Sequence, residues 1–137
     1  MSLKDYLIKP IKISDPRGNL GIIEAERNIP FPIRRVYYIY GVPQHVERGG
    51  HAHKALQQLI IPVAGSFEMM LDDGKHTAHY TLDDPSIGLH IDTMIWHEMK
   101  NFSKDAVGLV LASDYYDEND YYRDYQDFQA SVVGQST

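Results

Sequence analysis

Arg48-Gly49-Gly50-His51-Ala52-His53 places two histidines one residue apart, directly after a pair of glycines. If this segment is a strand, His51 and His53 point to the same face, because strand side chains alternate with a period of two. The glycines allow positive backbone angles or a close approach to a neighbouring strand. Arg48 adds a permanent cation beside two groups that titrate near neutrality. The pattern indicates a metal site or a proton-transfer site for an anionic substrate; the alternative is one core and one surface histidine on a bent strand.

Short strand-like segments separated by turns surround this stretch on both sides. The predicted strands cover residues 6–13, 20–25, 33–40, 59–65, 66–71, 75–82, 89–94 and 102–113. Pro10 marks the first of them as an edge strand, and Asp72-Asp73-Gly74 is a strong hairpin signal. In the strand over 33–40, alternation puts Arg35 and Tyr37 on one face. Such spacing predicts an all-β sandwich or barrel.

The C-terminal part of the chain has a different pattern. Residues 117–128 predict a short helix capped by Asn119 or Asp120. Tyr121, Tyr125 and Phe128 would then share one face, which favours packing on the sheet over a tyrosine-lined rim of a binding site. Residues 130–137 are predicted to be frayed.

Size and composition exclude several classes of function. With 137 residues, the chain predicts one domain over 1–137. Its net charge of -6 argues against a nucleic-acid partner. It has no cysteine and no 18-residue apolar run, so we expect no disulfides, no membrane span and a cytoplasmic location.

Two glycine-bounded blocks resemble the paired motifs of the cupin superfamily. The first runs from Gly49 to Gly65 and the second from Gly88 to His97. The resemblance implies a small RmlC-like jelly-roll barrel. In metal-binding cupins the first block supplies two histidines and a glutamate, and the second supplies a third histidine.

This chain departs from the metal-binding pattern at the acidic ligand. The glutamate position falls on Gln57 or Gln58, and the usual proline and glycine of the second block are replaced by Asp92 and Met94. A neutral amide is a poor substitute for an anionic ligand, so we expect no functional metal. Three histidines alone can still hold zinc, which keeps a metal-dependent cupin as an alternative.

A closer resemblance covers nearly the whole chain. Six segments, in order, are similar to the cupin sugar-nucleotide 3,4-ketoisomerases acting on dTDP-4-keto-6-deoxyglucose, the FdtA- or WxcM-like group. They are Asp15–Gly18, Asn28–Phe31, Arg35–Ile39, Arg48–Lys54, Trp96–Met99 and Leu111–Glu118. The family usually has phenylalanine at Gly50 and glutamate at Gln57.

The resemblance implies a proton-transfer mechanism without a redox cofactor. A ketone moves from C4 to C3 when the C3 proton, which is acidic beside the carbonyl, is removed and the enediol is reprotonated at C4. Matched to the family motif, His51 is the candidate carbon base, and His53 and Tyr37 are candidates for carrying the oxygen proton. Which histidine is the carbon base stays open at this point.

The implied substrate carries a diphosphate, so cations are expected near the histidines. Arg17, Arg35 and Arg48 are the candidates, because a guanidinium matches phosphate oxygens. His97 is expected to line the pocket from an opposite strand. The Trp-His-Glu segment is similar to the branch of the family that gives the galacto configuration at C4.

The resemblance also implies a biological setting and an assembly. The family serves deoxyamino-sugar biosynthesis for surface polysaccharide such as lipopolysaccharide O-antigen, and its members form homodimers that exchange N-terminal edge strands. Three alternatives remain: a metal-dependent oxygenase using His51, His53 and His97, a 3,5-epimerase of the same sugar nucleotide, and a non-catalytic sugar-binding cupin.

Overall fold

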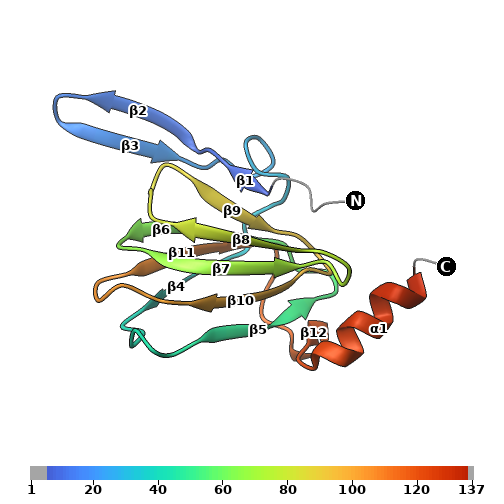
Figure 1. Cartoon of the computed structure of the whole chain (residues 1–137). Helices are drawn as coiled ribbons and strands as arrows, with labels where there is room; N and C mark the ends of the chain where they lie inside the picture. The colour runs from blue at the N-terminus through green and yellow to red at the C-terminus, as the bar shows by residue number, and fades with distance from the viewer. Residues whose placement is uncertain (1–5, 136–137) are drawn as a thin grey trace.

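Two five-stranded antiparallel sheets lie face to face in the computed structural model, which describes residues 6–135 (Figure 1). The first contains, in spatial order, β1 (Leu7–Ile8), β9 (Gly88–Ile91), β6 (Gln58–Ala64), β11 (Val107–Ala112) and β4 (Arg35–Tyr40). The second contains β12 (Tyr121–Tyr122), β5 (Arg48–His53), β10 (Trp96–Lys100), β7 (Phe67–Asp72) and β8 (Thr77–Leu82). This arrangement confirms the predicted all-β sandwich.

The core fills the space between the two sheets. Phe67, Met69 and Leu71 alternate along β7 and are at most 1 % exposed, and Ile60 and Val110 meet them from the first sheet. Strand β4 alternates in the same way: Arg35 and Tyr37 share one face, as predicted, and this is the less exposed face. The alternation with a period of two therefore sorts the core and the site residues onto the inner faces.

The predicted edge strand over residues 6–13 is divided into two strands. β1 ends at Ile8 and β2 (Ile11–Asp15) begins after Pro10, whose missing N–H interrupts strand pairing. β2 pairs with β3 (Gly18–Ile22) in a hairpin that projects from the sandwich (Figure 1). Among the described residues, neither strand pairs with any other.

The helix prediction for residues 117–128 is wrong in its position. A 3₁₀ turn, η1 (Glu118–Asp120), comes first, and β12 follows it, pairing with β5. The α-helix α1 occupies Tyr125–Gln135, and the Asp124 carboxylate accepts the Asp127 N–H at its start. Asp124 thus caps the helix, in place of Asn119 or Asp120.

The end of the chain is more ordered than predicted. Residues 130–135 belong to α1, whereas residues 136–137 lie outside the described part. Phe128 is fully buried and Tyr125 is partly buried beside Trp96, which confirms the predicted packing on the sheet. In the part of the chain that the structure describes, no helix is long and apolar enough to cross a membrane.

Candidate active site

The pairing of β5 with β10 brings His51 directly opposite His97. The register shifts by a bulge after His97, next to Gly49, whose φ is 86°. A Cβ atom on Gly49 would lie 2.9 Å from the His97 carbonyl oxygen, so only glycine fits this backbone contact. Gly50 also has a positive φ, of 77°, but a Cβ there would meet open space. Gly49 therefore sets how closely β5 and β10, the two strands that carry the histidines, approach each other.

Three imidazoles and one phenol form a compact cluster at this end of the barrel. The His51 ring centroid lies 4.5 Å from that of His97 and 5.2 Å from that of His53. The Tyr121 ring, from β12, lies 5.1 Å from His51 and 4.3 Å from His53. Ala52 packs on the opposite face of the sheet, so the predicted shared face of the two histidines is confirmed.

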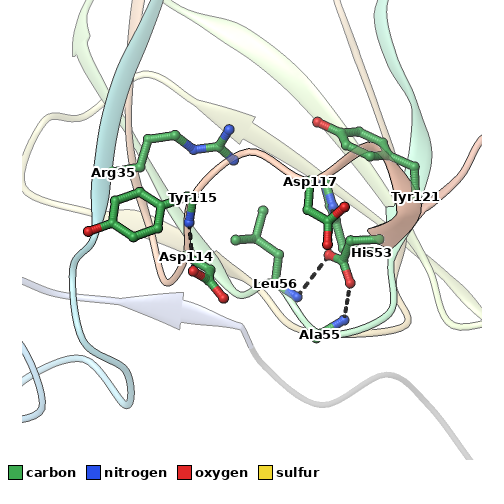
Figure 2. A pocket seen from close by; sticks show the side chains of 9 residues that line it. Arg35, His53, Ala55, Leu56, Asp114, Tyr115, Asp117 and Tyr121 are labelled. Atoms are coloured by element: carbon green, nitrogen blue, oxygen red, sulfur yellow. Dashed lines mark hydrogen bonds and ion pairs between the residues drawn. The ribbon is translucent and has the colours of Figure 1, made fainter.

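A cavity of about 200 Å³ opens beside this cluster. Its lining residues are Arg35, Tyr37, Ile39, Arg48, Gly49, His51, His97, Met99 and Tyr121. Five of the seven predicted site residues are among them. His53 borders a neighbouring cavity that shares Arg35 and Tyr121 with the first (Figure 2).

Burial keeps two of the histidines neutral. It lowers the pKa of His51 to about 4 and that of the fully enclosed His97 to about 3, and the neighbouring imidazoles lower both further. A histidine with such a pKa is uncharged at pH 7, with one ring nitrogen free to accept a proton. Because His51 also lines the cavity, it has both the protonation state and the position of a base.

His53 is more buried than its neighbour on the strand. Only 3 % of the residue is exposed, so the alternative of a surface histidine is wrong for His53. Burial lowers the pKa of His53, and the Asp120 carboxylate, 3.3 Å from its Nδ1, opposes that shift. Of the clustered histidines, His53 is the one with a nearby carboxylate to support its charged form.

Tyr37 extends from β4 toward the same end of the barrel. Its hydroxyl donates a hydrogen bond to Oε1 of Gln58, and burial raises its pKa to about 12. Tyr37 therefore keeps its proton and can serve as a donor. Gln57 instead faces His90, with Oε1 and Nε2 3.0 Å apart.

Neither glutamine acts as the acidic cupin ligand. Gln58 is 2 % exposed and its carbonyl oxygen is already bonded to Tyr37. Within residues 6–135, no group of three or more His, Cys, Asp or Glu side chains is arranged to hold a metal ion.

The predicted arginines differ in their placement. Arg35 lies over the Tyr37 ring, 5.3 Å from its centroid, and its buried Nε forms no hydrogen bond within residues 6–135. Arg48 lines the cavity from the start of β5. Arg17 lies at the tip of the β2–β3 hairpin, with 90 % of its side chain exposed and an ion pair to Asp15 at 2.7 Å. Within a single chain, Arg17 is not part of the histidine site.

Tyr121 lines the cavity, a role that the sequence offered only as the disfavoured rim of a binding site, and Arg123, which the sequence did not single out, stacks on its ring. The Arg123 guanidinium lies 4.0 Å from the Tyr121 ring centroid, and its Nε donates to Glu118 at 2.7 Å. The predicted helix over residues 117–128 favoured core packing for Tyr121, whereas the residue belongs to a short strand before the helix.

An antiparallel two-sheet barrel with histidines clustered at one end of its interior is the arrangement of a cupin, and the jelly-roll prediction holds. The family model described as "FdtA: WxcM-like, C-terminal" matches residues 4–133. The chain therefore belongs to the FdtA family, as its sequence motifs predicted.

Named relatives cover the chain almost end to end. It is 51 % identical over 131 residues to TDP-4-oxo-6-deoxy-alpha-D-glucose-3,4-oxoisomerase of Aneurinibacillus thermoaerophilus, covering 96 % of this chain and 94 % of the relative. A 3,4-ketoisomerase from Helicobacter canadensis is 45 % identical with a TM-score of 0.89, covering 93 % of this chain and 96 % of the other. QdtA, a sugar 3,4-ketoisomerase from Thermoanaerobacterium thermosaccharolyticum solved with TDP, is 42 % identical with a TM-score of 0.91, covering 96 % of each chain. QdtA was also solved as a histidine-to-asparagine mutant with TDP-4-keto-6-deoxyglucose.

Proposed function

We propose that this chain, as one domain over residues 1–137, converts dTDP-4-keto-6-deoxyglucose to a dTDP-3-keto-6-deoxyhexose. Its relatives in the FdtA family are isomerases named for TDP-sugars, and this chain is an isomerase of the same kind. The observation that carries the proposal is a neutral, largely buried His51 lining a cavity together with Tyr37 and two arginines.

His51 is the proposed carbon base. Its neutral imidazole takes the proton from C3 of the sugar, which is acidic beside the C4 carbonyl, and returns a proton to C4 of the enediol. The depressed pKa means that no prior deprotonation is needed near pH 7. It also makes the imidazolium a strong acid for the return step.

His53 and Tyr37 are the proposed carriers of the oxygen proton. The hydroxyl proton on O3 must leave and a proton must reach O4, so one group has to accept and donate in turn. Tyr37, with its pKa near 12, keeps its proton and stabilises the enediolate oxygen by turning its single O–H from Gln58 to that oxygen. His53, beside Asp120, accepts the O3 proton and passes it to O4.

The diphosphate is bound by arginines from two chains in our proposal. Arg35 and Arg48 line the cavity, and the unpaired Nε of Arg35 supports an anion there. Arg17 would reach a site only from a partner. We therefore propose a homodimer that exchanges its N-terminal strands.

The hairpin itself supports this assembly. Ile11, Ile13 and Leu20 lie on one face of it and are 45 %, 50 % and 56 % exposed. An apolar face on a two-stranded hairpin needs a cover, and another chain can supply it.

The finer proposals concern product and setting. His97 lies opposite His51 and would influence which face of C4 receives the proton, and we favour the galacto configuration. The product would serve deoxyamino-sugar synthesis for surface polysaccharide such as O-antigen. The absence of cysteine suits a reducing cytoplasm.

The test is to incubate the protein with dTDP-4-keto-6-deoxyglucose in deuterated water and identify the product by NMR. A 3-keto product with no deuterium at C5 is expected, whereas exchange at C5 would indicate a 3,5-epimerase. His51→Asn should lower turnover by about a thousandfold with TDP binding retained. His45→Asn, on the exposed loop before β5, is the matched control. The mechanism would be contradicted if the His51→Asn variant kept its turnover, or if the wild-type protein lost its turnover in the presence of a chelator.

A further inference from the structure

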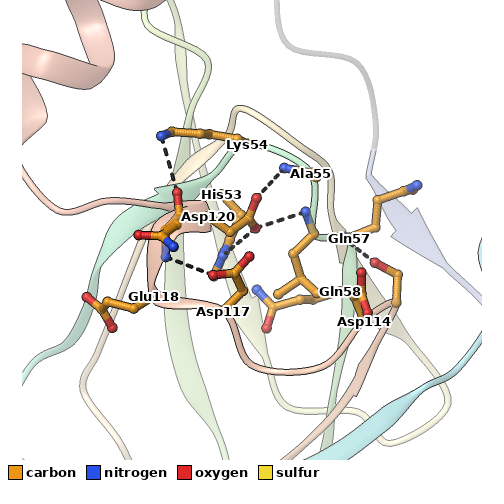
Figure 3. Close-up of polar contacts among 12 residues, drawn as sticks. His53, Lys54, Ala55, Gln57, Gln58, Asp114, Asp117, Glu118 and Asp120 are labelled. Carbon is orange, nitrogen blue, oxygen red and sulfur yellow. Dashed lines mark hydrogen bonds and ion pairs between the residues drawn. The ribbon is translucent and has the colours of Figure 1, made fainter.

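Asp120 joins the 3₁₀ turn to the end of the histidine strand. Its carboxylate accepts the backbone N–H of Ala55 at 2.8 Å (Figure 3). It also accepts the backbone N–H of Leu56 at 3.2 Å. Its carbonyl oxygen accepts the N–H of Lys54 at 2.9 Å. With three backbone donors holding it, the residue has little freedom to turn, and its carboxylate has a fixed direction.

That direction is toward His53. Oδ2 of Asp120 lies 3.3 Å from Nδ1 of His53, and the two side chains are 15 % and 4 % exposed. Nδ1 is buried and has no hydrogen-bond partner within residues 6–135, and the Asp120 carboxylate at 3.3 Å is its ion-pair contact. A buried ring nitrogen beside a single oriented carboxylate has one evident partner.

Asp120 stays outside the substrate cavity. Asp120 and His53 both line the neighbouring cavity, but the His53 ring also lies 5.2 Å from that of His51 and 4.3 Å from that of Tyr121, which line the substrate cavity. Asp120 therefore acts on the reaction only through His53.

The other groups around His53 do not replace Asp120. They come from β4, β5, β10, β12 and the segment after β12: Arg35, His51, His97, Tyr121 and Arg123. The two arginines oppose a positive charge on His53, and the two histidines are neutral near pH 7. Asp120 is the group whose charge favours a protonated His53.

We propose that Asp120 is a positioning residue that keeps the proton of neutral His53 on Nδ1 and leaves Nε2 free for the sugar oxygens. The inference rests on the oxygen-proton role proposed above for His53. An imidazole that serves two adjacent oxygens must use the same nitrogen for both. The other nitrogen therefore has to be a donor held by an acceptor.

The proton balance closes without a co-reactant. The O3–H bond breaks as Nε2–H forms, and His53 becomes an imidazolium stabilised by the Asp120 carboxylate. The Nε2–H bond then breaks as O4–H forms, and His53 returns to its neutral form with Nδ1 still protonated. The same division of roles orients the histidine in hydrolase triads, where the carboxylate itself takes no proton.

The experiment compares Asp120→Asn with Asp117→Asn. Asparagine at position 120 keeps an oxygen acceptor for a backbone N–H but loses the charge. We expect kcat to fall about a hundredfold with KM changed less than threefold. Asp117 lines the same cavity and caps η1 through the Asn119 N–H, a function that asparagine preserves, so its variant should keep normal turnover.

A spectroscopic measurement separates positioning from a structural role. In ¹⁵N NMR of the folded wild-type protein, His53 should show a proton on Nδ1, and Asp120→Asn should shift it toward Nε2. A wild-type His53 protonated on Nε2, or an Asp120→Asn variant with normal kcat, would overturn the proposal. The wild-type spectrum decides even if the variant folds poorly.

The variant His53→Asn distinguishes the Asp120 proposal from the proposed oxygen-proton role of His53, on which it rests. If His53→Asn turns over normally, the proposed role of His53 fails, and the Asp120 proposal fails with it. If His53→Asn is inactive and Asp120→Asn is fully active, only the Asp120 proposal fails.

Discussion

The histidine end of the barrel and the β2–β3 hairpin are built in opposite ways. At the histidine end, β5 is paired on both edges, by β10 and β12, and His53 and His97 are almost fully buried. In the hairpin, every residue of β2 and all but the last of β3 are exposed. The proposed proton-transfer groups thus lie within a single chain, whereas Arg17, a predicted phosphate ligand, lies on a part that this chain leaves uncovered.

The difference separates two requirements of the proposed reaction. Proton transfer needs groups whose protonation states are set by burial, and only a packed interior can provide them. Binding a diphosphate needs exposed cations that can approach a solvated anion. The first requirement is met by packing within one chain, and the second can be met by the exposed β2–β3 hairpin of another.

The largest effect on stability should come from lowering the pH, which acts on the buried histidines. The ordinary histidine pKa is 6.5, and burial lowers that of His97 to about 3. Between these values only the unfolded chain binds the proton, so stability is complete above pH 6.5 and falls as the pH drops. From pH 6.5 to 4.5, the contribution of His97 to the free energy of unfolding should fall by ~2 kcal/mol.

Urea unfolding at both pH values measures this loss. His97→Gln should flatten the pH dependence by that amount, whatever its effect on stability at pH 7. His79→Gln, at an exposed position on β8, should leave the slope unchanged. An equal slope in wild type and His97→Gln would show that His97 is not the group that titrates.

A smaller effect is expected from the two glycines that lead into the site. Alanine at Gly50 meets only the cost of a positive φ, about 1 kcal/mol. Alanine at Gly49 also meets the His97 backbone and should destabilise by roughly 2 kcal/mol more. Because β5 would shift against β10, Gly49→Ala should also lower kcat by a factor of several tens.

Thermal unfolding and steady-state kinetics of the two variants measure these effects. Their common positive φ makes Gly50→Ala the control for backbone strain. Equal losses in both variants would mean that the contact with His97 does not position the histidines.

Patterns local in the sequence predicted the fold and much of the site. The alternation along β5 correctly put His51 and His53 on the same face of that strand. The alternation along β4 likewise put Arg35 and Tyr37 on the same face of β4. These predictions succeeded because a period of two is a property of neighbouring residues.

Features that depend on distant partners were missed. Asp120 contacts residues more than 60 positions earlier in the chain, and Tyr121 pairs with His53 across the same separation. The sequence pattern around these residues is equally compatible with a helix. Residues 121–122 form a strand because they pair with the otherwise unpaired edge of β5. No local signal carries that information.

The smallest expected effect tests whether the hairpin completes the partner's site. Arg17→Ala should raise KM about tenfold with unchanged thermal stability, since its side chain is 90 % exposed. Arg34→Ala, another exposed arginine, is the control. When Arg17→Ala and His51→Asn proteins are mixed and allowed to exchange subunits, half of the dimers should be hybrids. If Arg17 serves the partner, each hybrid contains one fully intact site and one doubly altered site, and about a quarter of all sites regain wild-type kcat/KM. If Arg17 serves its own chain, or no dimer forms, the mixture shows only the average of the two variants.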